Sequence, residues 1–79
     1  MNRFPLFIDL TGRAAVVIGG GAVGLRRAEV LSRFGAQVTV ISPTLAHPAQ
    51  GLGHLPRPYR PGDLAGAFLV VAAADDHAV

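Results

Sequence analysis

Three consecutive glycines separate two segments of opposite character in the first half of the chain. Residues 13–18 form a short, almost wholly apolar run, and residues 19–21, all glycine, follow it directly. Such a run predicts a strand buried on both faces, as in a parallel sheet. From residue 22 to residue 34 the pattern becomes helical, with residues 24, 28, 31 and 35 on one face. The sequence therefore predicts a strand that turns sharply into a helix through glycine.

The remaining segments predict two further strands and a proline-rich connection. Residues 37–41 (QVTVI) form a second strand that Ser42-Pro43 ends, and residues 67–73 (AFLVVAA) form another buried strand. The prolines between these strands exclude a long helix. We expect only a short edge strand near residues 57–60 and one helical turn at residues 61–64. Asp75-Asp76 is typical of the N-cap and first turn of a following helix.

This order of elements indicates an α/β fold. A β-α-β unit with short connections requires parallel strands and a right-handed crossover. We therefore predict a Rossmann-type, doubly wound parallel sheet, of which the chain contains only the N-terminal part. Because Val79 falls in the opening turn of a predicted helix, we expect residues 1–79 to be a truncated NAD(P)-binding domain at the front of a longer protein.

Composition excludes several classes of protein. The chain contains no cysteine, which excludes a disulfide framework and a thiolate metal site. No apolar run reaches the roughly 18 residues that span a bilayer, and no secretory h-region is present, so we expect a cytoplasmic protein with no membrane partner. The net charge of +2 is too small for a nucleic-acid surface.

Side chains that could carry out catalysis or bind metal are scarce. The three histidines match no metal-ligand spacing, so we predict no metal site. The absence of lysine excludes a P-loop. Asp75 and Asp76 follow a strand end, where ligands of α/β sheets gather, but such a pair more often caps a helix. We therefore assign no catalytic residue within the chain.

The glycine spacing points to a dinucleotide. Gly19, Gly21 and Gly24 form the pattern G-x-G-x-x-G between a strand and a helix, which is the context that gives this pattern meaning. Gly19 would allow the sharp turn, Gly21 would admit a diphosphate close to the backbone, and Gly24 would let the helix pack tightly. The N–H groups of the first helical turn would then face the phosphates.

The ribose contact is less defined by the sequence. The fingerprint expects an acidic residue roughly 20 positions after the glycines, but Ser42, Pro43 and Thr44 stand there. The hydroxyl of Ser42 or Thr44 could bind the ribose, or Ser42-Pro43 could simply end the strand. Spacing alone therefore does not separate NAD from NADP. Arg26 and Arg27 could face anionic groups or form a solvated helix face.

Several stretches of the chain are distinctive when they are taken together. They are residues 4–10 (FPLFIDL), Gly12-Arg13, residues 16–21 (VVIGGG), Val23, Arg26, Arg27, residues 35–40 (GAQVTV) and residues 68–73 (FLVVAA). Together they resemble the N-terminal domain of siroheme synthase, which is the precorrin-2 dehydrogenase module. The resemblance covers nearly the whole chain and fades in residues 45–60.

The resemblance implies an NAD-dependent homodimeric enzyme that oxidises precorrin-2, a tetrapyrrole, to sirohydrochlorin. Some members of the family also insert iron, and some are fused to a methyltransferase. The diphosphate end of NAD would be held by Gly19, Gly21, Ala22, Val23 and Gly24. The adenosine side would be bordered by Pro43 and Thr44, and the nicotinamide side by Ala73, Ala74 and Asp75.

The chain departs from the family pattern in three places. Gly24 stands where relatives often carry alanine, Ala74 replaces a hydroxyl residue, and residues 45–60 are shortened and broken by proline. The family's catalytic aspartate would lie beyond Val79. Two other functions stay open: a non-catalytic domain that senses NAD(H), and an inactive fragment.

Overall fold

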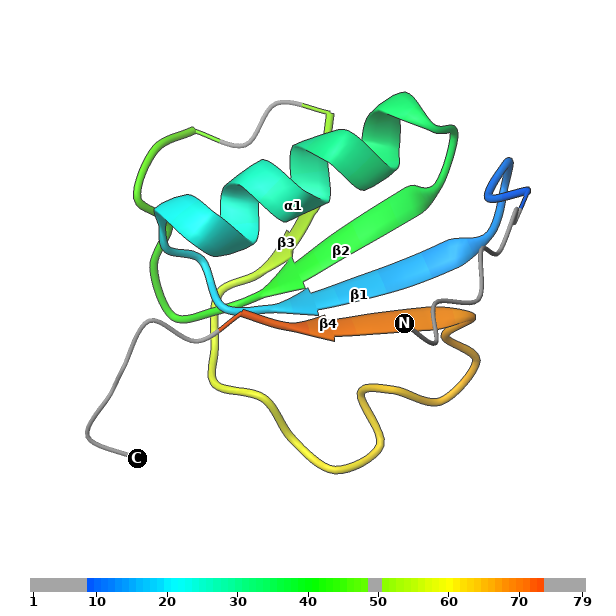
Figure 1. Cartoon of the computed structure of the whole chain (residues 1–79). Coiled ribbons are helices and arrows are strands. Elements are labelled where there is room, and N and C mark those ends of the chain that lie inside the picture. Colours follow the sequence, from blue (N-terminus) through cyan, green and yellow to red (C-terminus); the bar gives the residue numbers. More distant parts are fainter. Residues whose placement is uncertain (1–8, 49–50, 74–79) are drawn as a thin grey trace, which may run out of the picture.

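The structure, a computed structural model, describes residues 9–48 and 51–73. These residues form one parallel sheet with the strand order β3-β2-β1-β4 (Figure 1). The predicted Rossmann-type α/β fold is confirmed. The elements are β1 (Ala14–Ile18), α1 (Ala22–Arg33), β2 (Gln37–Ile41), β3 (Gly53–Leu55) and β4 (Leu69–Ala72).

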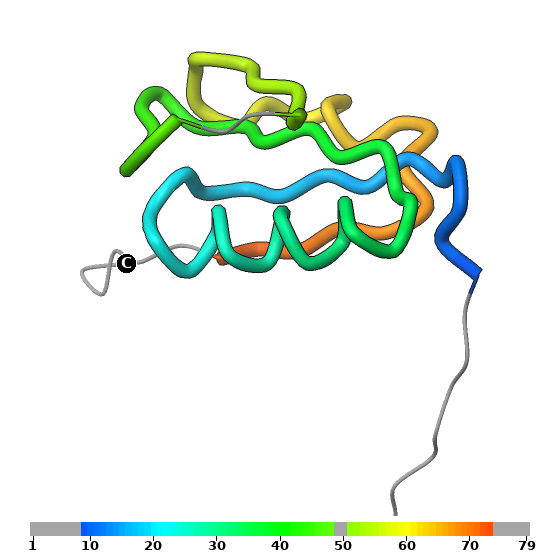
Figure 2. Tube along the Cα trace, turned by 90° about the horizontal axis from the view of Figure 1, so that it is seen from above, coloured from blue at the N-terminus to red at the C-terminus, as the bar shows by residue number. Residues whose placement is uncertain are grey.

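The connections lie on opposite faces of the sheet. Figure 1 shows α1 above the sheet and residues 56–68, in yellow to orange, below it. Right-handed crossovers require this arrangement, because the chain moves from β1 to β2 in one direction and from β3 to β4 in the other. In Figure 2 α1 runs back along β1, the strand that it follows.

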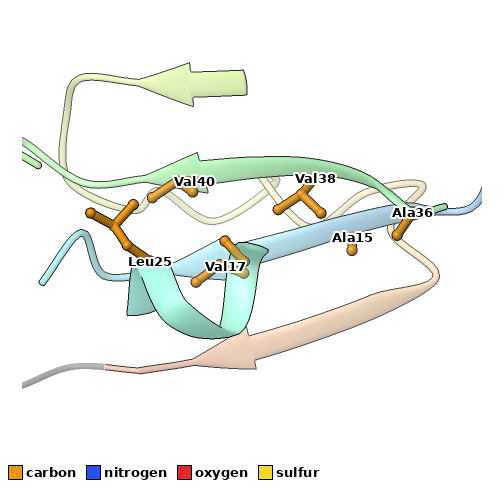
Figure 3. Close-up of a cluster of buried hydrophobic side chains, with 7 residues drawn as sticks. Ala15, Val17, Leu25, Ala36, Val38 and Val40 are labelled. Carbon is orange, nitrogen blue, oxygen red and sulfur yellow. The ribbon is translucent and has the colours of Figure 1, made fainter. Parts of the chain in front are cut away.

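A small apolar core fills the space between α1 and the sheet. Val17 of β1 is paired with Val40 of β2 and Val71 of β4, so these side chains point to the same face. Leu25 of α1 is completely buried against them (Figure 3), and burial of a leucine stabilises a fold by about 1.5–3 kcal/mol. The buried cluster consists of Ala15, Val17, Leu25, Ala28, Ala36, Val38 and Val40.

The helix ends as its sequence predicts. Phe34 is the C-cap residue, and Gly35, the next residue, has φ of 91°. This left-handed conformation is the usual way to stop a helix, and glycine adopts it without a steric penalty. Within the described residues α1 is the only helix, and it is too short and too polar to cross a membrane.

The prediction of an edge strand near residues 57–60 is wrong, since the strand is β3 at Gly53–Leu55. Pro56 and Pro58 flank Arg57 and cannot donate to a strand ladder. The helical turn expected at residues 61–64 is also absent from the described residues. Successive turns replace it, because Gly62 has φ of 100° and Gly66 has φ of 80°, which a right-handed helix cannot contain.

The last strand is shorter and more exposed than predicted. We expected a buried strand over residues 67–73, but β4 covers Leu69–Ala72, and Val70 is 40% exposed. Val70 points away from α1, toward the face that residues 56–68 cross. Beside this strand the Arg13 guanidinium lies 4.5 Å from the centroid of the Phe68 ring. The predicted helix cap at Asp75-Asp76 lies outside the described residues.

Candidate dinucleotide-binding site

The glycine turn begins directly at the carboxyl end of β1. Gly19 has φ of 118°, a conformation that side chains other than glycine's rarely allow. Its N–H donates to the carbonyl of Ile41 at 3.0 Å, which joins the turn to the end of β2. The predicted role of Gly19 in a sharp turn from strand to helix agrees with this geometry.

Gly24 brings α1 close to the turn that precedes it. A Cβ at this position would overlap the carbonyl oxygen of Gly19 and would lie 3.6 Å from the Cβ of Ala73. An alanine here would therefore force the backbone of this chain to shift. Close packing of the first helical turn depends on glycine at position 24.

The N-terminus of α1 has no side-chain cap. Gly21 is the N-cap residue, extended at φ of −75° and ψ of −176°, and the first turn contains no acidic residue. The first helical hydrogen bond is donated by Leu25 to the Gly21 carbonyl at 3.0 Å. Among the described residues, the N–H groups of Ala22, Val23 and Gly24 have no acceptor. Three backbone donors at the positive end of a helix therefore remain available to an anion.

The loop after β2 is held by its own polar groups. Ser42 is buried, and its hydroxyl donates to the Thr44 carbonyl at 2.6 Å. This hydrogen bond favours the interpretation of Ser42 as a residue that ends the strand and shapes the loop. Pro43 and Thr44, by contrast, are exposed, and Thr44 carries the loop's second hydroxyl.

Gly20 joins the two loops, a role that the sequence analysis missed. A Cβ at Gly20 would overlap the Thr44 carbonyl oxygen and would lie 2.7 Å from the Ser42 hydroxyl. The N–H of Ala46 donates to the Gly20 carbonyl at 2.8 Å. The pattern G-x-G-x-x-G accepts any residue at position 20. The presence of a glycine there is therefore the one feature of the sequence that could have indicated this close contact.

The third part of the site follows β4. Ala73 is buried, and its N–H donates to the Ile18 carbonyl at 2.9 Å. The glycine turn, the Ser42–Thr44 loop and Ala73 therefore gather where β1, β2 and β4 end (Figure 1). Ala74 and Asp75, which were predicted to join them, lie outside the described residues.

A hollow of about 600 Å³ lies along α1, and its lining extends from Ala22 in the first turn to Leu31. Arg26 and Arg27 line it and are exposed, so neither is held by the core. No ion pair involves them within the described part of the chain. The other lining residues are apolar: Ala22, Val23, Val30, Leu31 and Val71.

These features define a class of protein. The carboxyl ends of parallel strands, a turn without side chains and an uncapped helix N-terminus together form a cradle for a diphosphate. No side-chain carboxylate within the described residues takes the anion's place at the N–H groups of α1. The residues present therefore fit a dinucleotide, and the segment is of the Rossmann-type, dinucleotide-binding class.

Comparison with known proteins identifies the family. The chain matches the family model described as "Putative NAD(P)-binding" over residues 6–79, and it belongs to this family. It is 42% identical over 83 residues to the siroheme synthase of Methylobacillus flagellatus, covering 96% of this chain and 18% of that protein. It is 45% identical over 82 residues to the siroheme synthase of Pseudomonas aeruginosa, with the same coverage of 96% and 18%.

A solved structure agrees with these relatives. The structure titled "SirC, precorrin-2 dehydrogenase" matches with a TM-score of 0.82 and 30% identity over 96% of this chain and 41% of that one. The chain thus spans less than a fifth of the length of the two siroheme synthases. The resemblance seen in the sequence is confirmed, and membership of an NAD(P)-binding family confirms the predicted NAD cofactor.

Proposed function

We propose that the protein carrying this segment is an NAD-dependent precorrin-2 dehydrogenase of siroheme biosynthesis. The observation that carries this proposal is the set of available N–H groups at Ala22, Val23 and Gly24, immediately after a turn without side chains. The similarity to siroheme synthases and to a precorrin-2 dehydrogenase narrows a general dinucleotide site to this reaction.

The residues of the chain bind and orient the cofactor. In this proposal, the diphosphate lies between Gly19, Gly21 and the first turn of α1, and residues 43 and 44 border the adenosine. Ala73, Ala74 and Asp75 border the nicotinamide, so the ends of β1, β2 and β4 determine where its reactive face lies. When bound, the nicotinamide supplies hydride acceptance, the chemistry that side chains lack.

The substrate side of the proposal depends on charge. Precorrin-2 is a polycarboxylate, and the chain has a net charge of +2 with no acidic residue in the first turn of α1. The exposed guanidinium groups of Arg26 and Arg27 favour an anion approaching that end of the sheet. A catalytic acid outside the 79 residues, a homodimer, a cytoplasmic location and ferrochelatase activity stay predictions.

The test uses the intact protein with precorrin-2 and NAD⁺. We expect sirohydrochlorin and NADH to form in equal amounts, followed by their absorbances, and neither to form when NAD⁺ is omitted. NAD⁺ binding without oxidation of precorrin-2 would favour a sensing domain instead. Absence of NAD⁺ binding by calorimetry would favour an inactive fragment and overturn the proposal.

A further inference from the structure

His54 lies in β3, outside the glycine fingerprint and outside every residue predicted to touch the cofactor. Its Nε2 atom is 2.8 Å from the carbonyl oxygen of Ser42, and the ring is partly buried. A carbonyl oxygen only accepts hydrogen bonds, so the ring nitrogen is the donor and carries the proton. The bond joins an edge strand to the loop that follows β2.

The bond to His54 is one of three that fix Ser42. The N–H of Ser42 donates to the Leu55 carbonyl at 3.1 Å, and its hydroxyl donates to the Thr44 carbonyl at 2.6 Å. With the bond from His54, every polar group of Ser42 has a partner, which accounts for the burial of this residue at 8% exposure.

Ser42 in turn determines where Thr44 lies. The Thr44 carbonyl is held by the Ser42 hydroxyl and packs directly against Gly20. The loop has no acidic side chain that could bind a ribose directly. A loop without that carboxylate must present its remaining donors in a fixed place, because preorganised groups lose less entropy on binding.

We propose that His54 is a positioning residue for the adenosine half of the cofactor. It acts through Ser42 and holds the Pro43-Thr44 segment in place, and it does not touch the cofactor. The inference rests on the proposed function, which places the adenosine beside Pro43 and Thr44. It adds to that proposal a residue of β3 on which the affinity for one half of the dinucleotide depends.

The test measures the affinity of the intact protein for NAD⁺, AMP and nicotinamide mononucleotide by calorimetry. Loss of one neutral hydrogen bond weakens an interaction by roughly five- to tenfold. We expect His54→Leu to weaken the affinities for NAD⁺ and AMP by that factor and to leave the affinity for nicotinamide mononucleotide unchanged. It should also raise the KM for NAD⁺ without changing kcat. His54→Gln, whose amide can still donate, restores both affinities.

Two further variants separate positioning from general loosening. His54→Asn keeps a polar side chain that is too short to reach Ser42. We expect it to lose the same affinities as His54→Leu, so it tests the proposal even if His54→Leu folds poorly. His47→Leu is the matched control, because His47 is exposed and its Nδ1 lies 3.1 Å from the carbonyl of Pro48, its neighbour in the chain.

The outcomes distinguish this inference from the proposed function. Equal losses for AMP and nicotinamide mononucleotide, or unchanged affinities in both His54→Leu and His54→Asn, overturn the role of His54 while the wild type still binds NAD⁺. Failure of the wild type to bind NAD⁺ overturns the proposed function, and the role of His54 fails with it.

Discussion

Two connections at the same edge of the sheet differ in whether their polar groups have hydrogen-bond partners. The turn between β1 and α1 carries no side chain, and its helical N–H groups have no acceptor among the described residues. The loop after β2 is the reverse, since Ser42 has a partner for every polar group it carries. The N–H groups of the first region can therefore bind a ligand, whereas the polar groups of the second bind one another and fix the conformation of the loop.

The difference shows how a small domain can prepare a site without many functional side chains. A diphosphate needs close approach to the backbone, and this requires the absence of side chains. The surrounding loops must then be rigid for other reasons, because an open turn contributes little to its own order. Gly20 joins the two regions, since its missing side chain makes room for the Thr44 carbonyl.

The largest predicted effect comes from filling the open turn. Gly21 is extended, with φ of −75°, so aspartate can adopt its conformation. The new carboxylate would cap α1 by accepting from Val23 or Gly24, which stabilises a helix. We therefore expect Gly21→Asp to keep or raise Tm. The affinity for NAD⁺ should fall by on the order of a hundredfold or more, because a fixed anion occupies the diphosphate's place.

Calorimetry and a thermal melt on the same sample check both halves of this prediction. Ala65→Asp adds the same charge in an exposed turn, at a residue whose φ is not positive, and serves as the control. If Gly21→Asp still binds NAD⁺ as the wild type does, the open turn is not the diphosphate site.

The second effect tests the junction between the regions. A Cβ at Gly20 would lie within 3 Å of the Ser42 hydroxyl and overlap the Thr44 carbonyl. Overpacking of this kind costs about 1–3 kcal/mol, so we expect Gly20→Ala to lower the free energy of unfolding by that amount and to weaken NAD⁺. Gly53→Ala is the control, because it is the same substitution with a milder contact: its Cβ would lie 3.2 Å from the Thr39 hydroxyl. Equal urea midpoints for both variants would mean that the two loops adjust independently.

The two regions also differ in how far the sequence alone could predict them. The turn from β1 into α1 was predicted because apolar runs, glycine spacing and helical period all lie within neighbouring residues. The predicted helix face still missed Leu25, since the apolar stripe of a core-facing helix is wider than one row of residues.

The second region was predicted poorly because its contacts are between residues distant in sequence. His54 bonds to a residue 12 positions away, and Gly20 packs on a loop beyond the next strand. The residues of β3 (GHL) have no apolar alternation. Backbone pairing with β2 forms that strand, and no local pattern records such pairing.

A third prediction separates shape from contact within the second region. Ser42→Ala removes the hydrogen bond to the Thr44 carbonyl, so we expect the free energy of unfolding to fall by about 1 kcal/mol. Thr44→Ala leaves Tm unchanged, because its side chain is exposed, yet it weakens NAD⁺ several-fold if the hydroxyl meets the ribose. Chemical denaturation and calorimetry on both variants check this. The reverse assignment, with stability lost only in Thr44→Ala, would contradict it.

The smallest effect lies in a third connection, on the far face of the sheet, where side chains hold the shape without serving the site. Arg57 donates two hydrogen bonds to Asp63, at 2.7 and 2.8 Å. These bonds, and one from the Arg60 N–H, lower the pKa of Asp63 to about 2. A carboxyl whose pKa is lower in the folded state stabilises the fold above its unfolded pKa of about 4, and this contribution disappears as the pH falls toward 2.

Asp63→Asn should therefore lower Tm slightly at neutral pH and flatten the fall of Tm between about pH 4 and pH 2. We expect its affinity for NAD⁺ at pH 7 to equal that of the wild type, in contrast to Thr44→Ala, because residues 56–68 cross the face opposite α1. Arg57→Gln removes the partner of the same carboxylate and should flatten the slope in the same way. A weakened NAD⁺ affinity in Asp63→Asn would show that the third connection also shapes the site. Loops on both faces of the sheet, and not only the loop after β2, would then position the open turn's ligand.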